Sequence, residues 1–384
     1  MDPRQQLNDL VGENLLRTLT PGESKNLRIT RDGRELWNFA SNDYLGLSGH
    51  PAIAAAYIEG IAKYGTGSAA SRLVTGTSHA HTTLEEAIAT AKHSEAALTF
   101  SSGYATALSA IPVIAGKGDY VLLDKLAHAS LIDAARMSEA TLRVFPHNDT
   151  EKLGKLLSTL RANHPGARLL VVTESVFSMD GDLCPLREIL DLCELHRAQL
   201  LLDEAHALGV LGSTGMGLAE QLGLHNRVHF QMGTLSKALG LSGGYLAASR
   251  DWIDLIINRA RPFIYTTAPP PALAHAALAA LELVRSAEGK ALRKKLFRNV
   301  SLLRANHPSA ILPIIIGENQ AALAASSSLA KKGFLAPAIR YPTVPRNTAR
   351  LRITLSAGHP EDAVKSLATT LFAVAEAGLD SMDN

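Results

Sequence analysis

Residues 168–206 read RLLVVTESVFSMDGDLCPLREILDLCELHRAQLLLDEAH and decide the fold class. The runs at 169–172 and 200–203 are short and almost wholly apolar, which is typical of strands buried on both faces of a parallel sheet. Between them, the apolar residues of PLREILDLCELHR (185–197) recur at helical intervals. A strand, a helix and a second strand in this order predict a βαβ unit with parallel strands.

The same pattern extends outward along the chain. Further strand-like runs are DYVLLD (119–124), TLRVFP (141–146), VHFQMGTL (228–235) and GGYLAAS (243–249). We predict an α/β fold in which a large domain (41–284) holds a mainly parallel sheet covered by helices. A smaller α+β domain (285–384) follows, and an N-terminal helical segment (1–40) is expected to pack on that small domain.

Composition narrows the class of protein. The 384 residues suggest about two domains, and the contents of 46% apolar and 19% charged residues are those of a globular protein. The net charge of +2 and the absence of basic tracts speak against nucleic acid or a membrane surface as partner. Only two cysteines are present, Cys184 and Cys193, and no secretory signal is recognised, so we expect a cytoplasmic protein.

Two motifs suit a phosphorylated planar ligand. Ser102, Gly103 and Tyr104 stand at an expected strand-to-helix turn, where free backbone N–H groups can bind phosphate. His128 follows another strand and could stack on a ring or carry a proton. Taken singly, an ordinary capped turn and a structural histidine explain these residues equally well.

Two further motifs carry charge into apolar surroundings. Asp203 ends the most apolar strand, where a buried carboxylate needs a cation, and His206 follows three residues later. Lys237 is the one charged residue of GTLSKALGLSGGY (233–245), next to Thr234 and Ser236, and a desolvated lysine can attack a carbonyl. A helix-capping aspartate and a surface lysine are the structural alternatives. Together, the four motifs suit a ligand with a phosphate, a flat ring, a ring cation and an aldehyde, and pyridoxal 5'-phosphate has all four groups.

Two other motifs are judged to be decoys. GTGSAA (65–70) resembles a dinucleotide-binding loop, but the residues before it are helical rather than a strand. GLSGG (240–244) resembles the nucleophile elbow of serine hydrolases, but Ser242 precedes a strand instead of following one.

The chain resembles the α-oxoamine synthase family of fold-type I pyridoxal-phosphate enzymes. The resemblance covers nearly the whole chain and is carried by NFASNDYLGLSGHP (38–51), ESVFSMDGD (174–182), DEAH (203–206) and GTLSK (233–237). It implies that Lys237 forms a Schiff base with the cofactor and that Asp203 pairs with the pyridine nitrogen. The remaining cofactor contacts that it implies are Ser102, Gly103, Tyr104, His128, Ser178, His206, Thr234 and Ser236.

The resemblance also implies substrate contacts and a homodimer. Arg352 and Asn42 would bind the carboxylate of an amino acid, and Arg17 and Thr354 would contact the acyl substrate. Thr266 would reach the phosphate in the neighbouring subunit, so that the two active sites are shared.

Two residues depart from the family pattern. Tyr104 stands where phenylalanine is frequent, and Glu204 makes DEAH of the more usual DDAH. We expect Glu204 to point away from the cofactor.

The segment PTVPRNTARLRITLSAGH (342–359) favours one branch of this family. Its members are C-acyltransferases that condense L-alanine with a pimeloyl thioester in biotin biosynthesis and release carbon dioxide. The acyl group could arrive on coenzyme A or on an acyl carrier protein. Alternatives are glycine C-acetyltransferase, 5-aminolevulinate synthase, serine palmitoyltransferase or an aminotransferase on this fold. A serine hydrolase acting through Ser242 and a catalytically silent dimeric scaffold are the alternatives of a different class. No metal site is expected.

Overall fold

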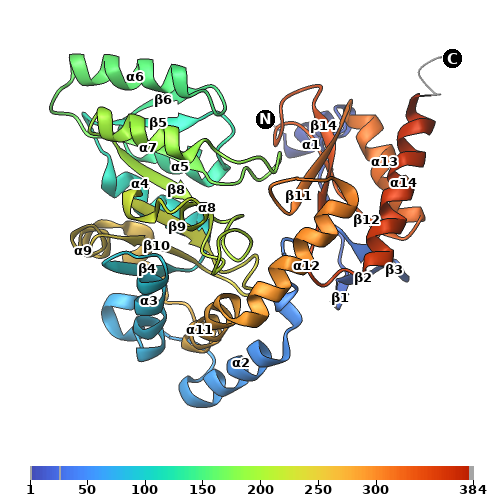
Figure 1. The fold of residues 1–384 in the computed structure, drawn as a ribbon, viewed down its shortest axis with the longest axis horizontal. Coiled ribbons are helices and arrows are strands. Elements are labelled where there is room, and N and C mark those ends of the chain that lie inside the picture. The colour runs from blue at the N-terminus through green and yellow to red at the C-terminus, as the bar shows by residue number, and fades with distance from the viewer. Residues whose placement is uncertain (1, 26, 380–384) are drawn as a thin grey trace. The chain divides into compact units, whose positions relative to one another are not determined.

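The structure is a computed structural model that describes residues 2–25 and 27–379, and it divides into two compact units. Unit 1 comprises Met1–Gly46, Met179–Gly181 and Lys294–Asn384. Unit 2 comprises Leu47–Ser178 and Asp182–Arg293. The N-terminal segment and the C-terminal part of the chain thus belong to one unit, and most elements of both units are labelled in Figure 1.

Unit 2 is built on a seven-stranded sheet with the order β4-β10-β9-β8-β7-β5-β6. Its strands are β4 (Ala96–Phe100), β5 (Tyr120–Asp124), β6 (Thr141–Phe145), β7 (Leu169–Glu174), β8 (Gln199–Asp203), β9 (Phe230–Thr234) and β10 (Gly244–Ala248). Strand β10 runs antiparallel to β4 and to β9, and the pairs from β9 to β6 are parallel. The predicted α/β fold with a mainly parallel sheet is therefore confirmed.

Helices cover both faces of this sheet. They are α2 (Pro51–Tyr64), α3 (His79–Ala91), α4 (Gly103–Ile114), α5 (Ala129–Met137), α6 (Thr150–Asn163), α7 (Leu186–Leu195), α8 (Leu218–Gln221), α9 (Arg250–Arg259), α10 (Arg261–Ile264) and α11 (Pro271–Arg285). Residues of α4, α5 and α9 form one apolar core with alternate residues of the strands, among them Leu201 and Met232. The neighbouring Gln231 faces the other way, because its side-chain amide donates to the carbonyl of Lys92 at the end of α3.

Unit 1 contains two smaller sheets. The first has the order β1-β2-β3-β12, with β1 (Glu23–Lys25), β2 (Arg28–Arg31), β3 (Arg34–Asn38) and β12 (Phe334–Leu335). The second is antiparallel with the order β11-β14-β13, from β11 (Ile311–Gly317), β13 (Ala338–Ile339) and β14 (Ala349–Thr354). Its helices are α1 (Pro3–Gly12), α13 (Asn319–Lys331) and α14 (Glu361–Leu379), and α12 (Ala287–Leu303) spans the border of the two units.

The N-terminal segment differs from its helical pattern. Helix α1 ends at Gly12, and Asn14 adopts a left-handed φ of 54°, which terminates a helix. The hairpin of β1 and β2 follows and was not predicted, because strands this short carry no clear alternation of apolar and polar residues. Among the described residues, no helix is both long and apolar enough to cross a membrane.

Candidate active site

The carboxyl ends of three neighbouring parallel strands bring acidic and hydroxyl side chains to one edge of the unit 2 sheet. Strand β7 ends at Glu174, β8 at Asp203 and β9 at Thr234. Glu174 pairs directly with Asp203 in the sheet register. This edge is the place where open α/β sheets bind ligands, so it is the candidate active site.

Lys237 lies in the loop that joins β9 to β10. Its Nζ is 2.8 Å from Nε2 of His206, a residue of the segment that follows β8. The loop is held by Thr234, whose hydroxyl donates to the carbonyl of Gly243 at 2.7 Å. It turns at Gly240, which has a φ of 71° and whose Cβ would lie 2.3 Å from the backbone nitrogen of Ser48. Glycine at position 240 therefore allows the Lys237 loop to pack closely against the backbone at residue 48.

Asp203 is a buried carboxylate at the end of β8, with 5% of its surface exposed. Its Oδ1 accepts a hydrogen bond from the N–H of Ala205 at 2.9 Å. Burial raises the pKa of Asp203, while the charges of Lys237 and His128 oppose that rise. A buried carboxylate in this setting is stabilised by a cation or a charged N–H donor.

His128 caps the N-terminus of α5. Its Nδ1 accepts from the backbone N–H of Ser130 at 3.2 Å and lies 2.8 Å from the Ser130 hydroxyl. Burial of the ring lowers the pKa of His128, and Lys237 lowers it further, against the influence of Asp203. The contacts with Ser130 fix the orientation of the ring, which suits stacking on a flat ligand.

The turn that was predicted to bind a phosphate is the N-terminus of α4. Ser102 is the N-cap, and its hydroxyl accepts from the N–H of Ala105 at 3.0 Å. The N–H groups of Gly103 and Tyr104 belong to the first turn and have no intrahelical acceptor. A Cβ on Gly244 of β10 would lie 2.7 Å from the nitrogen of Gly103, so this glycine allows the strand to approach the turn.

The side chain of Tyr104 makes a contact of its own, in addition to any contact through its backbone N–H. It is 43% exposed, and its hydroxyl hydrogen-bonds to the carboxylate of Asp133. This hydrogen bond raises the pKa of Tyr104.

Glu174 is a site residue that the sequence analysis missed. It is 2% exposed, and its Oε1 has no hydrogen-bond partner among the described residues. Burial raises the pKa of Glu174 well above its usual value, and Asp203 raises it further. The signal was present in the sequence, because Glu174 ends an apolar strand in the same way as Asp203.

Glu204 is fully buried, and its carboxylate contacts Lys92 and the N–H of Ala219. Its carboxylate forms an ion pair with Lys92, which is 2% exposed. Neither Lys92 nor this pair was anticipated, because a lysine near the end of an amphipathic helix is usually solvated.

These donors and acceptors fit pyridoxal phosphate. The buried carboxylate of Asp203 matches a protonated ring nitrogen, and the amine of Lys237 matches an aldehyde. The first turn of α4 matches a phosphate. The unpartnered oxygen of Glu174 adds a polar group at the same sheet edge. Ser178 is also buried in this unit, and Thr266 is half-buried beside the bridge formed by Ser71 and Thr267.

The expected substrate residues lie in unit 1, mostly on and beside β14. The guanidinium of Arg352 is buried and donates to the hydroxyl of Thr354 at 2.9 Å and to Oδ1 of Asn42 at 3.1 Å. Thr354 is completely buried, so its hydroxyl orients Arg352. Arg17 is exposed beyond the end of α1, where it donates to the hydroxyl of Thr343 at 3.1 Å.

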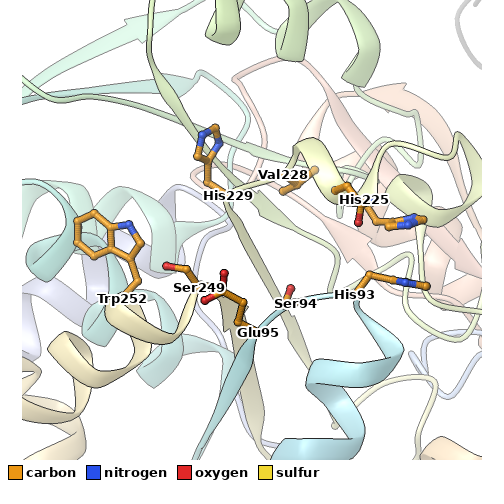
Figure 2. Close-up of a pocket in the computed structure, with 10 residues that line it drawn as sticks. His93, Ser94, Glu95, His225, Val228, His229, Ser249 and Trp252 are labelled. Atoms are coloured by element: carbon orange, nitrogen blue, oxygen red, sulfur yellow. The ribbon is translucent and has the colours of Figure 1, made fainter.

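A separate cavity of about 260 Å³ lies at the amino-terminal ends of β4 and β9 (Figure 2). Glu95 and His229 directly precede these strands, and the rings of His93 and His225 stack with centroids 4.1 Å apart. The cavity contains none of the expected site residues.

The two decoys behave as expected. Ser242 is followed by β10, so it does not occupy a nucleophile elbow. Residues 65–70 follow helix α2, so they are not a dinucleotide loop.

The chain is similar to known proteins over most of its length. Residues 34–371 match the family described as class I and II aminotransferases. A curated 8-amino-7-oxononanoate synthase from Geobacter sulfurreducens is 46% identical, covering 93% of each chain. Proteins of the same name from Bordetella petrii and Maricaulis maris are 45% and 48% identical, covering 95% of each chain and 90% and 88% respectively.

Solved structures have the same fold. Serine palmitoyltransferase from S. paucimobilis, described as carrying a PLP–myriocin adduct, is 28% identical, with a TM-score of 0.91 over 98% of this chain and 97% of its own. An 8-amino-7-oxononanoate synthase from Francisella tularensis is 26% identical, with a TM-score of 0.75 over 90% of this chain and 98% of its own. The chain belongs to the class I and II aminotransferase family of fold-type I pyridoxal-phosphate enzymes, among relatives named 8-amino-7-oxononanoate synthase.

Proposed function

We propose that this protein is a pyridoxal-phosphate-dependent C-acyltransferase that makes 8-amino-7-oxononanoate for biotin biosynthesis. L-Alanine loses its Cα proton, and Cα forms a bond to the thioester carbonyl of a pimeloyl donor. The carbon–sulfur bond breaks and releases the thiol. The alanine carboxylate leaves as carbon dioxide, and a proton returns to Cα. One alanine and one thioester therefore give one product, one thiol and one carbon dioxide.

The observation that carries this proposal is the pairing of Lys237 with His206 at the sheet edge where buried Asp203 ends β8. When bound, pyridoxal phosphate supplies an aldehyde for the lysine and a protonated ring that withdraws electrons from Cα. Asp203 holds the proton on the ring nitrogen. Lys237 removes the Cα proton and returns it, because a partly desolvated amine can act as a base.

The other residues of this edge orient the reactants. His128 stacks on the ring, and His206 orients Lys237 through the 2.8 Å contact. Thr234, Ser236 and Ser178 complete the cofactor contacts. Ser102, Gly103 and Tyr104 hold the phosphate at the start of α4.

Arg352 selects an α-amino acid, because its planar guanidinium binds a carboxylate through two parallel hydrogen bonds. Asn42 and Thr354 hold that guanidinium in place, as their contacts with it support. Arg17 is proposed to contact the acyl substrate.

A panel of substrates tests the assignment. Glycine, L-serine and L-alanine are each combined with acetyl-, succinyl-, palmitoyl- and pimeloyl-coenzyme A, and the thiol and product mass are followed. We expect turnover with L-alanine and pimeloyl-coenzyme A. Preference for glycine or serine would replace the proposal with another α-oxoamine synthase, and amino transfer without thiol release would indicate an aminotransferase. Pimeloyl-acyl carrier protein is compared with the coenzyme A thioester to identify the natural donor.

We also propose a homodimer in which the partner subunit's Thr266 reaches the cofactor phosphate. Exposed apolar residues near this segment support an interface, since Leu73, Val74 and Tyr265 are 53%, 75% and 72% exposed. The bridge from Ser71 to Thr267 brings the two segments together.

Mixed dimers test this sharing. Lys237→Ala and Thr266→Glu subunits are inactive alone, and their mixture should regain activity because each mixed dimer contains one intact site. A mixture without activity, in which mass spectrometry shows mixed dimers, would contradict sharing.

We propose a cytoplasmic location. Both cysteines are buried free thiols in the structure, which is compatible with a reducing compartment.

A further inference from the structure

Lys92 is an unusual residue of unit 2 because its ammonium group is buried. It follows helix α3 directly, and only 1% of its side-chain surface is exposed. A buried ammonium is costly unless it is paired and hydrogen-bonded. The groups that pair with the Lys92 ammonium therefore indicate which part of the structure it stabilises.

The Lys92 ammonium has two partners on the segment that follows β8. It donates to the carboxylate of Glu204 and, at 2.7 Å, to the carbonyl of Met216. Burial alone would lower the pKa of Lys92, but the neighbouring Glu204 raises it above its usual value. The neighbouring cavity of about 10 Å³ is close to the space that one water occupies, so it is not a ligand site.

Glu204 connects this charge to the turn that carries the candidate catalytic residues. Its N–H donates to the carbonyl of Met232 on β9 at 2.8 Å, and its own carbonyl accepts from Ala207 at 3.0 Å. The second carboxylate oxygen of Glu204 accepts from the N–H of Ala219 at 3.0 Å. Residue 204 is thus fixed through both its backbone and its side chain.

The chain on either side of Glu204 leads to the site. Asp203 precedes it, and His206, the partner of Lys237, follows two residues later. Side chains alternate along a strand, so fixing Glu204 on the α3 face directs Asp203 to the opposite face, where His128 and Lys237 influence its pKa.

We infer that Lys92 and Glu204 form a positioning pair, which holds the turn of residues 203–206 so that Asp203 and His206 are aligned with Lys237. This role rests on the proposed function. Neither side chain touches the reactants, and the pair acts through the geometry of its neighbours. The negative charge of Glu204 also raises the pKa of Asp203. Lys92 places a positive charge beside Glu204.

Single substitutions test the pair in the holoenzyme. Lys92→Met leaves the Glu204 carboxylate without its ion-pair partner, and Glu204→Gln leaves the Lys92 ammonium without its ion-pair partner. A matched control is Glu85→Gln, because Glu85 lies on the same helix in a buried ion pair with Arg72 at 2.8 Å, outside the turn of residues 203–206. Four quantities are measured: the melting temperature, kcat, KM for L-alanine, and the pH midpoint at which the absorbance of the bound cofactor changes.

We expect both substitutions in the pair to lower kcat roughly 10- to 100-fold with little change in KM, as for a misaligned catalytic group. The absorbance midpoint should shift by about one pH unit, upward for Lys92→Met and downward for Glu204→Gln. Glu85→Gln should lower the melting temperature while its kcat and its midpoint remain those of the wild type.

The opposite result would overturn the inference. If both substitutions in the pair lower the melting temperature as the control does, but keep the wild-type kcat and midpoint, the pair is only structural. Should a single variant fail to fold, the double variant Lys92→Met/Glu204→Gln, which removes both charges of the pair, takes its place. Its midpoint should stay near the wild-type value because the two opposite shifts cancel, and a wild-type kcat in it would be equally contradictory. The midpoint needs no substrate, so an error in the substrate assignment would leave this test readable.

Discussion

Replacing Asp203 by asparagine isolates the charge that we assign to the pyridine nitrogen. The Asp203→Asn variant keeps the shape of the side chain, and its amide oxygen can still accept the hydrogen bond from Ala205, which is 2.9 Å long in the structure. Because burial raises the pKa of Asp203, its charge opposes folding. The variant should therefore melt at the same temperature as the wild type or above it.

The expected loss is in the chemistry. Removing one preorganised electrostatic contact from a water-poor site costs about 3 to 4 kcal/mol of transition-state stabilisation, or roughly 100- to 1000-fold in rate. Exchange of the L-alanine Cα proton with deuterated water, followed by NMR without any thioester, measures this step directly. Asp149→Asn is the matched control, because Asp149 caps helix α6 through an exposed hydrogen bond to the N–H of Lys152 and asparagine caps equally well. Exchange at the wild-type rate in the Asp203→Asn variant would refute the role of the carboxylate.

Three further predictions concern binding, pH and backbone geometry. Arg352→Lys should raise KM for L-alanine roughly 10- to 100-fold with little change in kcat, because a lysine cannot form two parallel hydrogen bonds to the alanine carboxylate. An unchanged KM would exclude the role of Arg352 in binding that carboxylate. Burial alone would lower the pKa of His147, but hydrogen bonds to Asp124 and Asp182 raise it to about 10. A histidine whose pKa is raised in the folded state stabilises the fold below its unfolded pKa of about 6.5, and this contribution is lost as the pH rises toward 10. The free energy of unfolding, measured in urea, should therefore fall more steeply over this pH range in the wild type than in His147→Gln. Equal declines in the two proteins would contradict the prediction. Gly217→Ala should lower the free energy of unfolding by more than about 1 kcal/mol, because Gly217 has a φ of 107° and the new Cβ would lie 2.4 Å from a carboxylate oxygen of the buried Glu204. An unchanged melting curve would disprove the clash.

Most of the large domain could be predicted from the sequence because its strands are strong local signals. The runs that became β5, β7 and β8 are continuously apolar, and helical spacing between them is clear. Lys237 was singled out because it is the one charged residue of 233–245, and Asp203 because it ends an apolar strand. The structure brings Lys237 to His206, which the sequence order alone could not establish.

Other features depend on contacts between distant segments. The partner of Glu204 is Lys92, which lies 112 positions earlier, and no local pattern connects them. The burial of Thr354 follows from its place on β14. The short strands β1 and β2 form a hairpin with too few residues to show a period.

The most direct test of the proposed reaction is its stoichiometry with carboxyl-labelled L-alanine and pimeloyl-coenzyme A. Labelled carbon dioxide, free thiol and the condensation product are quantified from the same sample, with Lys237→Ala as the inactive control. The account predicts equal amounts of all three from the wild type and none from the variant. Thiol without carbon dioxide, or equal product from Lys237→Ala, would contradict it.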